Sequence, residues 1–96
     1  MKFLGRVSYW NANTEIDVAA LDTERKHAIL GECKYHVQPV DTDVLSALVR
    51  KSENIPELDG YARTFLLFSR SGFTKQLRQA AARRKDVFLV NEMDVL

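Results

Sequence analysis

Cysteine, histidine, proline and glycine are all scarce in this chain of 96 residues, which contains one cysteine, two histidines, two prolines and four glycines. The single cysteine, Cys33, rules out an internal disulfide bond, and no group of cysteines and histidines has the spacing of a zinc site. No apolar run approaches the roughly 20 residues that span a bilayer, and the first residues lack the apolar stretch of a secretion signal. We therefore expect a cytoplasmic protein with no membrane contact.

Neither sign of charge is in large excess, since 14 basic and 13 acidic side chains leave a formal net charge of +1. Hydrophobic residues make up 46% of the chain and charged residues 28%, which is typical of a globular protein and argues against disorder. We expect a single domain over residues 1–96. The basic residues cluster, because residues 70–85 contain no acidic side chain. This stretch predicts either a phosphate-facing surface or a solvated helix face, and its six basic residues are Arg70, Lys75, Arg78, Arg83, Arg84 and Lys85.

The spacing of apolar residues predicts an α/β domain with the element order β-β-β-α-β-α-β. Asp41 or Thr42 can cap the first helix, and Ser71 precedes a second helix in which Phe73 and Leu77 share a face. An apolar run predicts that the fourth strand is buried on both faces in the centre of the sheet. The strands are expected at residues 3–10, 15–21, 27–35, 64–68 and 86–90, and the first helix from its cap at residue 41 or 42 to about residue 53.

Four charged side chains recur at alternate positions of the second and third strands. A turn within residues 22–26 would pair Leu21 with Ala28. On this register two opposed pairs share one face of the hairpin, Asp17 with Glu32 and Glu15 with Lys34. A register shifted by two residues keeps the same four groups together, so the prediction does not depend on the precise pairing.

The clustered carboxylates indicate a site for a divalent cation. Two carboxylates about 5 Å apart repel each other unless a cation lies between them. Mg²⁺ prefers oxygen ligands and usually takes one or two carboxylates together with water and substrate phosphate. We therefore predict a Mg²⁺ or Mn²⁺ site. Lys34 would then be the positive partner of the negative charge that develops during a reaction at this site. The alternative is a cross-strand ion pair between Glu15 and Lys34 on a solvated face.

The arrangement resembles the PD-(D/E)XK nuclease superfamily. Asp17 lies on one expected strand, and Glu32-x-Lys34 follows on the next strand after a gap of 14 residues. A helix is expected after these two strands. More narrowly, several segments resemble the nuclease-like domain at the C-terminus of prokaryotic, archaeal-type AAA ATPases. These segments are Trp10, Glu15–Val18, Leu30–Lys34 and Leu67–Phe73.

This resemblance implies a restriction-endonuclease-like fold, in which helices flank a mixed central sheet. It also implies that residues 1–96 form the C-terminal part of a longer ATPase. Many members of the superfamily carry a helix before the first strand, whereas this chain opens almost directly into an expected strand. That helix is then expected in a preceding domain of the longer protein, or else part of the core is missing.

The resemblance also implies roles for individual residues. Asp17 and Glu32 would bind the metal through their carboxylates, and Cys33 through its backbone carbonyl. Lys34 would position or activate the attacking water, and Glu15 would reach a second cation or orient Lys34. The implied reaction is the hydrolysis of phosphodiester bonds in a nucleic acid, with DNA as the expected partner.

The segment Ser69–Phe73 lies between a buried strand and an expected helix N-terminus, where backbone N–H groups can hold a phosphate. Ser71 as a simple helix cap is an equally good interpretation. The candidate nucleic-acid-binding residues are Arg70, Ser71, Lys75 and Arg78.

Three classes of function remain open at this stage. The first is a metal-dependent nuclease, or a DNA-binding derivative of one, that acts beside an ATPase domain in the same chain or a neighbouring one. The second is an inactive nuclease-like module that serves interaction or DNA binding. The third is a fragment whose activity requires a homodimer.

Overall fold

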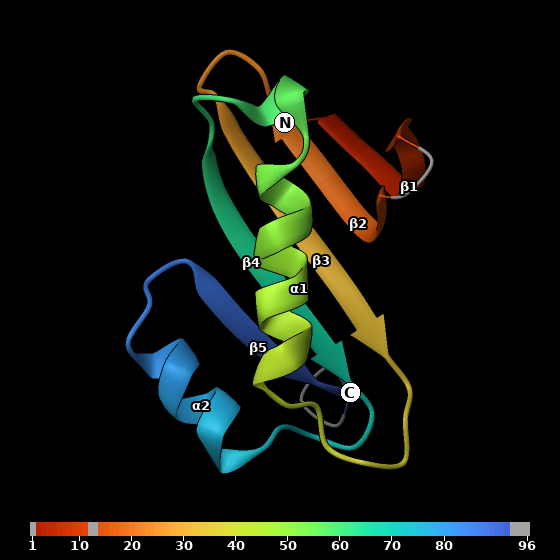
Figure 1. Ribbon diagram of the computed structural model, residues 1–96, viewed down its shortest axis with the longest axis vertical. Helices are drawn as coiled ribbons and strands as arrows, with labels where there is room; N and C mark the ends of the chain where they lie inside the picture. Colours follow the sequence, from red (N-terminus) through yellow and green to blue (C-terminus); the bar gives the residue numbers. More distant parts are fainter. Residues whose placement is uncertain (1, 12–13, 93–96) are drawn as a thin grey trace.

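The computed structural model describes the backbone of residues 2–11 and 14–92, and the side chains of residues 16–92. The described elements follow the expected order, with one additional short 3₁₀ helix (Figure 1). None of the helices in these residues is long and apolar enough to cross a membrane. The elements are β1 (Lys2–Asn11), β2 (Thr14–Asp22), β3 (His27–Lys34), α1 (Thr42–Glu53), η1 (Pro56–Leu58), β4 (Ala62–Ser69), α2 (Lys75–Ala82) and β5 (Val87–Asn91).

The five strands form one mixed sheet in the order β1-β2-β3-β4-β5. The first three strands pair antiparallel, whereas β3, β4 and β5 run parallel and are joined by α1 and α2. Parallel neighbours require a crossover connection, and a helix usually supplies it. Leu21 pairs with Ala28 across β2 and β3, which confirms the predicted register of the hairpin.

Both helices pack on the same face of the sheet, which we call the helix face (Figure 1). Side chains alternate along each strand, so every second residue of β3, β4 and β5 points into this layer. Leu48 of α1 and Leu77 of α2 are fully buried against it. The sheet contributes Ala19, Ala28, Leu30, Phe65, Leu67 and Val87 to this core.

The opposite face of the sheet is only partly covered. Ile29, Leu66 and Phe68 are half-buried there, and Phe88 is 53% exposed. The prediction that the fourth strand is buried on both faces is therefore wrong for one of them. Its apolar run lies between two neighbouring strands, as expected, but no helix in the described residues packs on this second face.

The start of α1 agrees with the prediction, whereas the cap of the second helix is Thr74 and not Ser71. The side chain of Asp41 accepts the N–H of Thr42, and the hydroxyl of Thr74 accepts the N–H of Leu77 at 3.2 Å. Helix formation before Thr74 is prevented because Gly72 has a φ of +87° and Phe73 forms a β-bridge with Val40.

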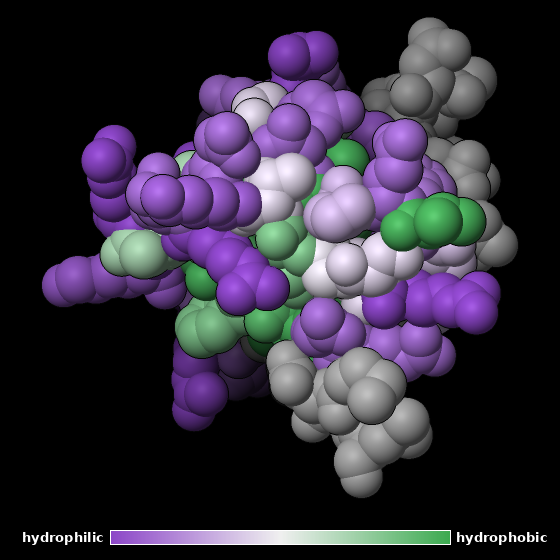
Figure 2. All heavy atoms as spheres, turned by 90° about the horizontal axis from the view of Figure 1, so that it is seen from below, coloured by the Kyte–Doolittle hydropathy of each residue, from purple (hydrophilic) through white to green (hydrophobic). Residues whose placement is uncertain are grey.

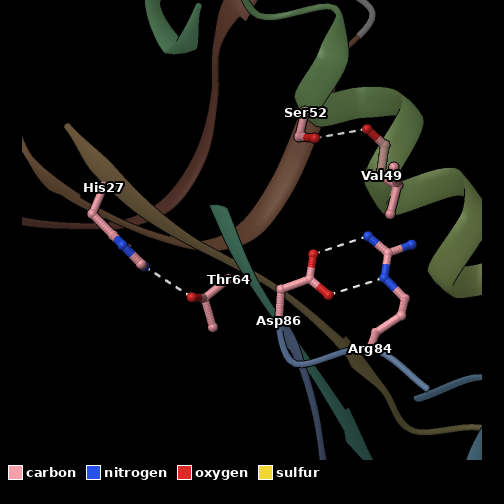
Figure 3. Close-up of polar contacts among 6 residues, drawn as sticks. All are labelled: His27, Val49, Ser52, Thr64, Arg84 and Asp86. Carbon is pink, nitrogen blue, oxygen red and sulfur yellow. Dashed lines mark hydrogen bonds and ion pairs between the residues drawn. The ribbon is translucent and has the colours of Figure 1, made fainter. Parts of the chain in front are cut away.

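Several polar contacts tie the elements together (Figure 3). The ring of His27 lies 2.8 Å from the hydroxyl of Thr64, which links β3 to β4. Arg84 donates two hydrogen bonds of 2.9 Å to Asp86, and its guanidinium lies 5.8 Å from the centre of the Phe65 ring. The hydrogen bonds from Arg84 hold the pKa of Asp86 below its usual range. Within the basic stretch, Arg84 therefore has a structural role.

Replacing Leu48 with alanine is expected to lower the free energy of unfolding by about 2 to 5 kcal/mol, because the change leaves a cavity between α1 and the sheet. Urea denaturation measures this loss. Ser46→Ala, on the exposed side of the same helix, is the control and should change the free energy by less than about 0.5 kcal/mol. Equal losses in the two variants would contradict the core position of Leu48.

Candidate functional site

The carboxylates of Asp17 and Glu32 come together where the β2–β3 ladder ends. The last backbone pair is Val18 with Gly31, so Asp17 and Glu32 are the next residues on their strands. Beyond this pair, the side chain of Asp17 forms a hydrogen bond to β3: its Oδ2 accepts the N–H of Cys33 at 2.9 Å. Glu32 lies on the helix face, because it alternates with Leu30. The register of β2 against β1 shifts between Ala19 and Ile16, so Asp17 is placed by its hydrogen bond to Cys33 and not by alternation.

Glu32 is the most unusual residue of this site, because its side chain is charged and only 7% exposed. Burial raises the pKa of the Glu32 carboxyl above its ordinary value of 4.5, and the negative charge of Asp17 acts in the same direction. The positive charges of Lys51 and Lys34 act against this rise. Two acids and two lysines therefore share one electrostatic environment.

Lys51 is a member of this cluster that the sequence analysis did not identify. Its Nζ donates to Oε1 of Glu32 at 2.9 Å, and its side chain remains 34% exposed. Lys51 comes from α1, and it lies on the same side of this helix as Val44 and Leu48, at positions i, i+4 and i+7. Lys51 could have been identified from the sequence, because it continues the apolar face of this helix.

The burial of Glu32 excludes a fully solvated face at this position. The predicted pairing of Glu15 with Lys34 concerns a side chain outside the described residues, since β2 is described at Glu15 only through its backbone. The side chain of Trp10 lies outside them as well. The observed cluster is thus Asp17, Glu32, Lys34 and Lys51.

The donor set fits a divalent cation of the Mg²⁺ type. Among residues 16–92, no three side chains of His, Cys, Asp or Glu are grouped as a metal site. Two carboxylates and one predicted backbone carbonyl, that of Cys33, would leave the remaining positions to water and phosphate, which is the usual arrangement for Mg²⁺. A zinc site would instead need a closed set of nitrogen and sulfur ligands.

The predicted nucleic-acid-binding residues divide into two groups. Arg70 is exposed, and its backbone N–H donates to the carbonyl of Lys34 at 3.1 Å, so its backbone lies next to the end of β3, the strand that carries Glu32. The hydroxyl of Ser71 donates to the carbonyl of His36. Lys75 and Arg78 are exposed on α2, which packs mainly against β5 and α1. Arg70 is therefore the basic residue of this set that joins the candidate site.

The strands β3 and β4 both run toward the end of the molecule that holds Lys34 and Arg70 (Figure 1). Viewed from that end, hydrophilic residues surround a smaller area in which hydrophobic side chains reach the surface (Figure 2). The surface next to the candidate site is thus mainly polar.

Comparisons with known proteins identify a family and a fold. Residues 1–50 match the model of the family DUF234, described as archaeal and bacterial proteins of unknown function. No curated protein matches the sequence. The structure is similar to the crystal structure of a repair endonuclease from Pyrococcus abyssi, with a TM-score of 0.63 and 14% sequence identity. The similarity covers 95% of this chain but only 38% of the endonuclease, so it establishes a shared nuclease-like fold.

Stability should depend on pH through Glu32. Because its pKa is raised by folding, the folded protein holds this proton more tightly than the unfolded chain does. The stability that Glu32 contributes is fully present below pH 4.5, and it is lost as the pH rises through the folded-state pKa. Relative to wild type, Glu32→Gln should therefore gain stability between about pH 4 and about pH 7. Urea denaturation at both pH values measures the gain. Glu24→Gln, in an exposed turn, controls for the lost charge. The same pH dependence in both variants would contradict a raised pKa of Glu32 in the folded protein.

Replacing Lys51 with methionine should destabilise the protein by about 1 to 3 kcal/mol at neutral pH, because the buried carboxylate of Glu32 loses this partner. The partial exposure of Lys51 keeps the loss below that of a fully buried pair. In a Glu32→Gln background the same change should cost less, and a double-mutant cycle measures the difference. A coupling energy of zero would show that the pair does not stabilise the fold.

Proposed function

Since the chain belongs to the DUF234 family and has a nuclease-like fold, we propose that it is a divalent-metal-dependent nuclease domain that hydrolyses phosphodiester bonds. The observation that carries this proposal is the buried carboxylate of Glu32 beside Asp17. Keeping two acids together costs stability, because the low-dielectric surroundings and the neighbouring charge both disfavour ionisation. A bound cation would offset the repulsion between the two carboxylates, and a catalytic cation site would explain why the two acids lie together.

The proposed metal ligands are the carboxylates of Asp17 and Glu32 and the backbone carbonyl of Cys33. When bound, Mg²⁺ or Mn²⁺ would supply Lewis-acid activation of the phosphate and of the attacking water. The N–H of Cys33 holds Asp17 in position, and Lys51 does the same for Glu32, so both carboxylates are oriented before substrate arrives.

Lys34 is the proposed residue for the reacting phosphate. It follows Glu32 on the same face of β3, and its charge already acts on Glu32. A lysine at this point would orient the attacking water and stabilise the negative charge that develops on the phosphate oxygens. Arg70, which is bonded to Lys34 through the backbone, would hold a neighbouring phosphate. Glu15 keeps its proposed supporting role beside Lys34.

DNA is the proposed substrate, and the shared fold with a repair endonuclease supports this choice. We further propose that the domain acts beside an AAA-type ATPase, in the same chain or as a neighbour, on the strength of the segments that resemble such proteins. A homodimer would bring two candidate sites to one substrate.

A second candidate is an inactive nuclease-like module that binds a partner or DNA. The ion pair between Lys51 and Glu32 favours this alternative, because a lysine already provides part of the positive charge that a metal would supply. The two functions differ in whether the protein cleaves DNA when a divalent cation is present.

Incubation with plasmid and single-stranded DNA should yield cleavage products with Mg²⁺ or Mn²⁺ and none with EDTA. Asp17→Ala and Lys34→Ala should each lower the rate by at least about 100-fold, because each removes a group that acts on the reacting phosphate. Asp43→Ala and Lys85→Ala, both exposed outside the site, are matched controls that should retain the wild-type rate. Cleavage that is equal in all five proteins would refute the proposed site, and cleavage that persists in EDTA would refute its dependence on a metal. No cleavage by wild type would favour the inactive module.

A further inference from the structure

Two hydrophobic side chains are exposed on the loop that follows β3. Tyr35 is 68% exposed and Val37 is 94% exposed. Side chains of this size favour burial, so two of them exposed on one short loop make this loop a candidate binding surface. The third large hydrophobic residue with high exposure in the described part of the chain is Phe88, which lies on the open face of the sheet.

This loop is fastened to the loop that follows β4. The N–H of Val40 donates to the carbonyl of Gly72 at 2.9 Å, and the N–H of Thr74 donates to the carbonyl of Val40 at 2.9 Å. The hydroxyl of Ser71 donates to the carbonyl of His36. We call the two loops together, residues 35–40 and 70–74, the ridge. Because the ridge is already ordered by these bonds, a ligand would not have to order it on binding.

The charge of the ridge suits an anion. Neither of its two segments contains an acidic residue, and the nearest carboxylate in the chain, Asp41 at the far end of the first segment from Lys34, accepts a hydrogen bond from the hydroxyl of Thr74 at 2.8 Å. Lys34 lies one residue before the ridge, and the exposed Arg70 begins its second segment. The carbonyl of Lys34 accepts the N–H of Arg70 and the carbonyl of His36 accepts the hydroxyl of Ser71, so the backbone of Tyr35 lies between two points at which the loops are bonded. Exposed Tyr35, Val37 and Arg70 are therefore carried by two loops that are bonded to each other, at the end of the strand that holds Lys34.

We propose that the ridge binds an unpaired nucleobase next to the reacting phosphate, with Tyr35 stacked on the base and Arg70 on the backbone. This inference rests on the proposed function, because it assumes that the substrate is a nucleic acid. Stacking on an aromatic side chain accepts any base, since every base has a π-face. In a duplex both faces of each internal base are already stacked, and exposing one costs energy. The substrate class is therefore single strands, overhangs and frayed ends.

The test is a binding measurement in EDTA, which separates binding from hydrolysis. Fluorescence anisotropy is recorded with a labelled oligothymidylate, with a strand of the same length that lacks bases, and with a blunt duplex. Tyr35→Ala should weaken binding to oligothymidylate about tenfold, whereas Tyr35→Phe should change it by less than about twofold, because the ring is kept. Phe88→Ala, which removes an exposed aromatic ring elsewhere, is the matched control and should bind as wild type does.

The strand without bases should bind Tyr35→Ala and wild type equally, because only stacking is lost. Equal weakening on all three probes, or no difference between Tyr35→Ala and Phe88→Ala, would overturn the inference. No binding to any probe would also overturn it and would leave the ridge as a surface for a protein partner. Base stacking on Tyr35 without metal-dependent cleavage would support the binding role of the ridge and refute the nuclease. Metal-dependent cleavage without base stacking on Tyr35 would support the nuclease and refute the binding role of the ridge.

Discussion

The carboxylate of Glu32, buried beneath α1 and beside Asp17, is the constraint around which the site is arranged. The antiparallel pairing of β2 with β3 brings Asp17 to the backbone of Cys33, and the crossover through α1 brings Lys51 over Glu32. Each of these contacts joins two elements that follow one another in the chain. The fold of the sheet therefore determines the geometry of the charged cluster.

The charged cluster and the ridge meet at the end of β3. Glu32 and Lys34 point into the helix layer, and the chain then continues into an exposed segment that contains Tyr35. The parallel pairing of β3 with β4 brings Arg70 to the same edge of the sheet. The proposed metal ligands, the proposed phosphate-binding residues and the exposed ring of Tyr35 thus come from β2, β3, β4 and the loops that follow β3 and β4.

Local patterns in the sequence predict most of this fold, and tertiary contacts account for what they miss. Alternation and turn position were sufficient for the pairing of Leu21 with Ala28, because both are properties of a short hairpin. Ser71 and Thr74 are equally good caps by residue type, and the choice between them depends on a bridge to a distant loop. Lys51 was missed because its role depends on which face of the sheet α1 covers. The roles of the site residues stay predictions.

The central claim is that Asp17 and Glu32 form a cation site, and the most direct test is the melting temperature as a function of Mn²⁺ concentration. A ligand that binds only the folded state stabilises it by about 2.7 kcal/mol at 100 times its dissociation constant. The account predicts that the melting temperature of wild type rises with Mn²⁺, and that Asp17→Asn and Glu32→Gln abolish the rise. A melting temperature that is independent of Mn²⁺, or that rises equally in all three proteins, would contradict it.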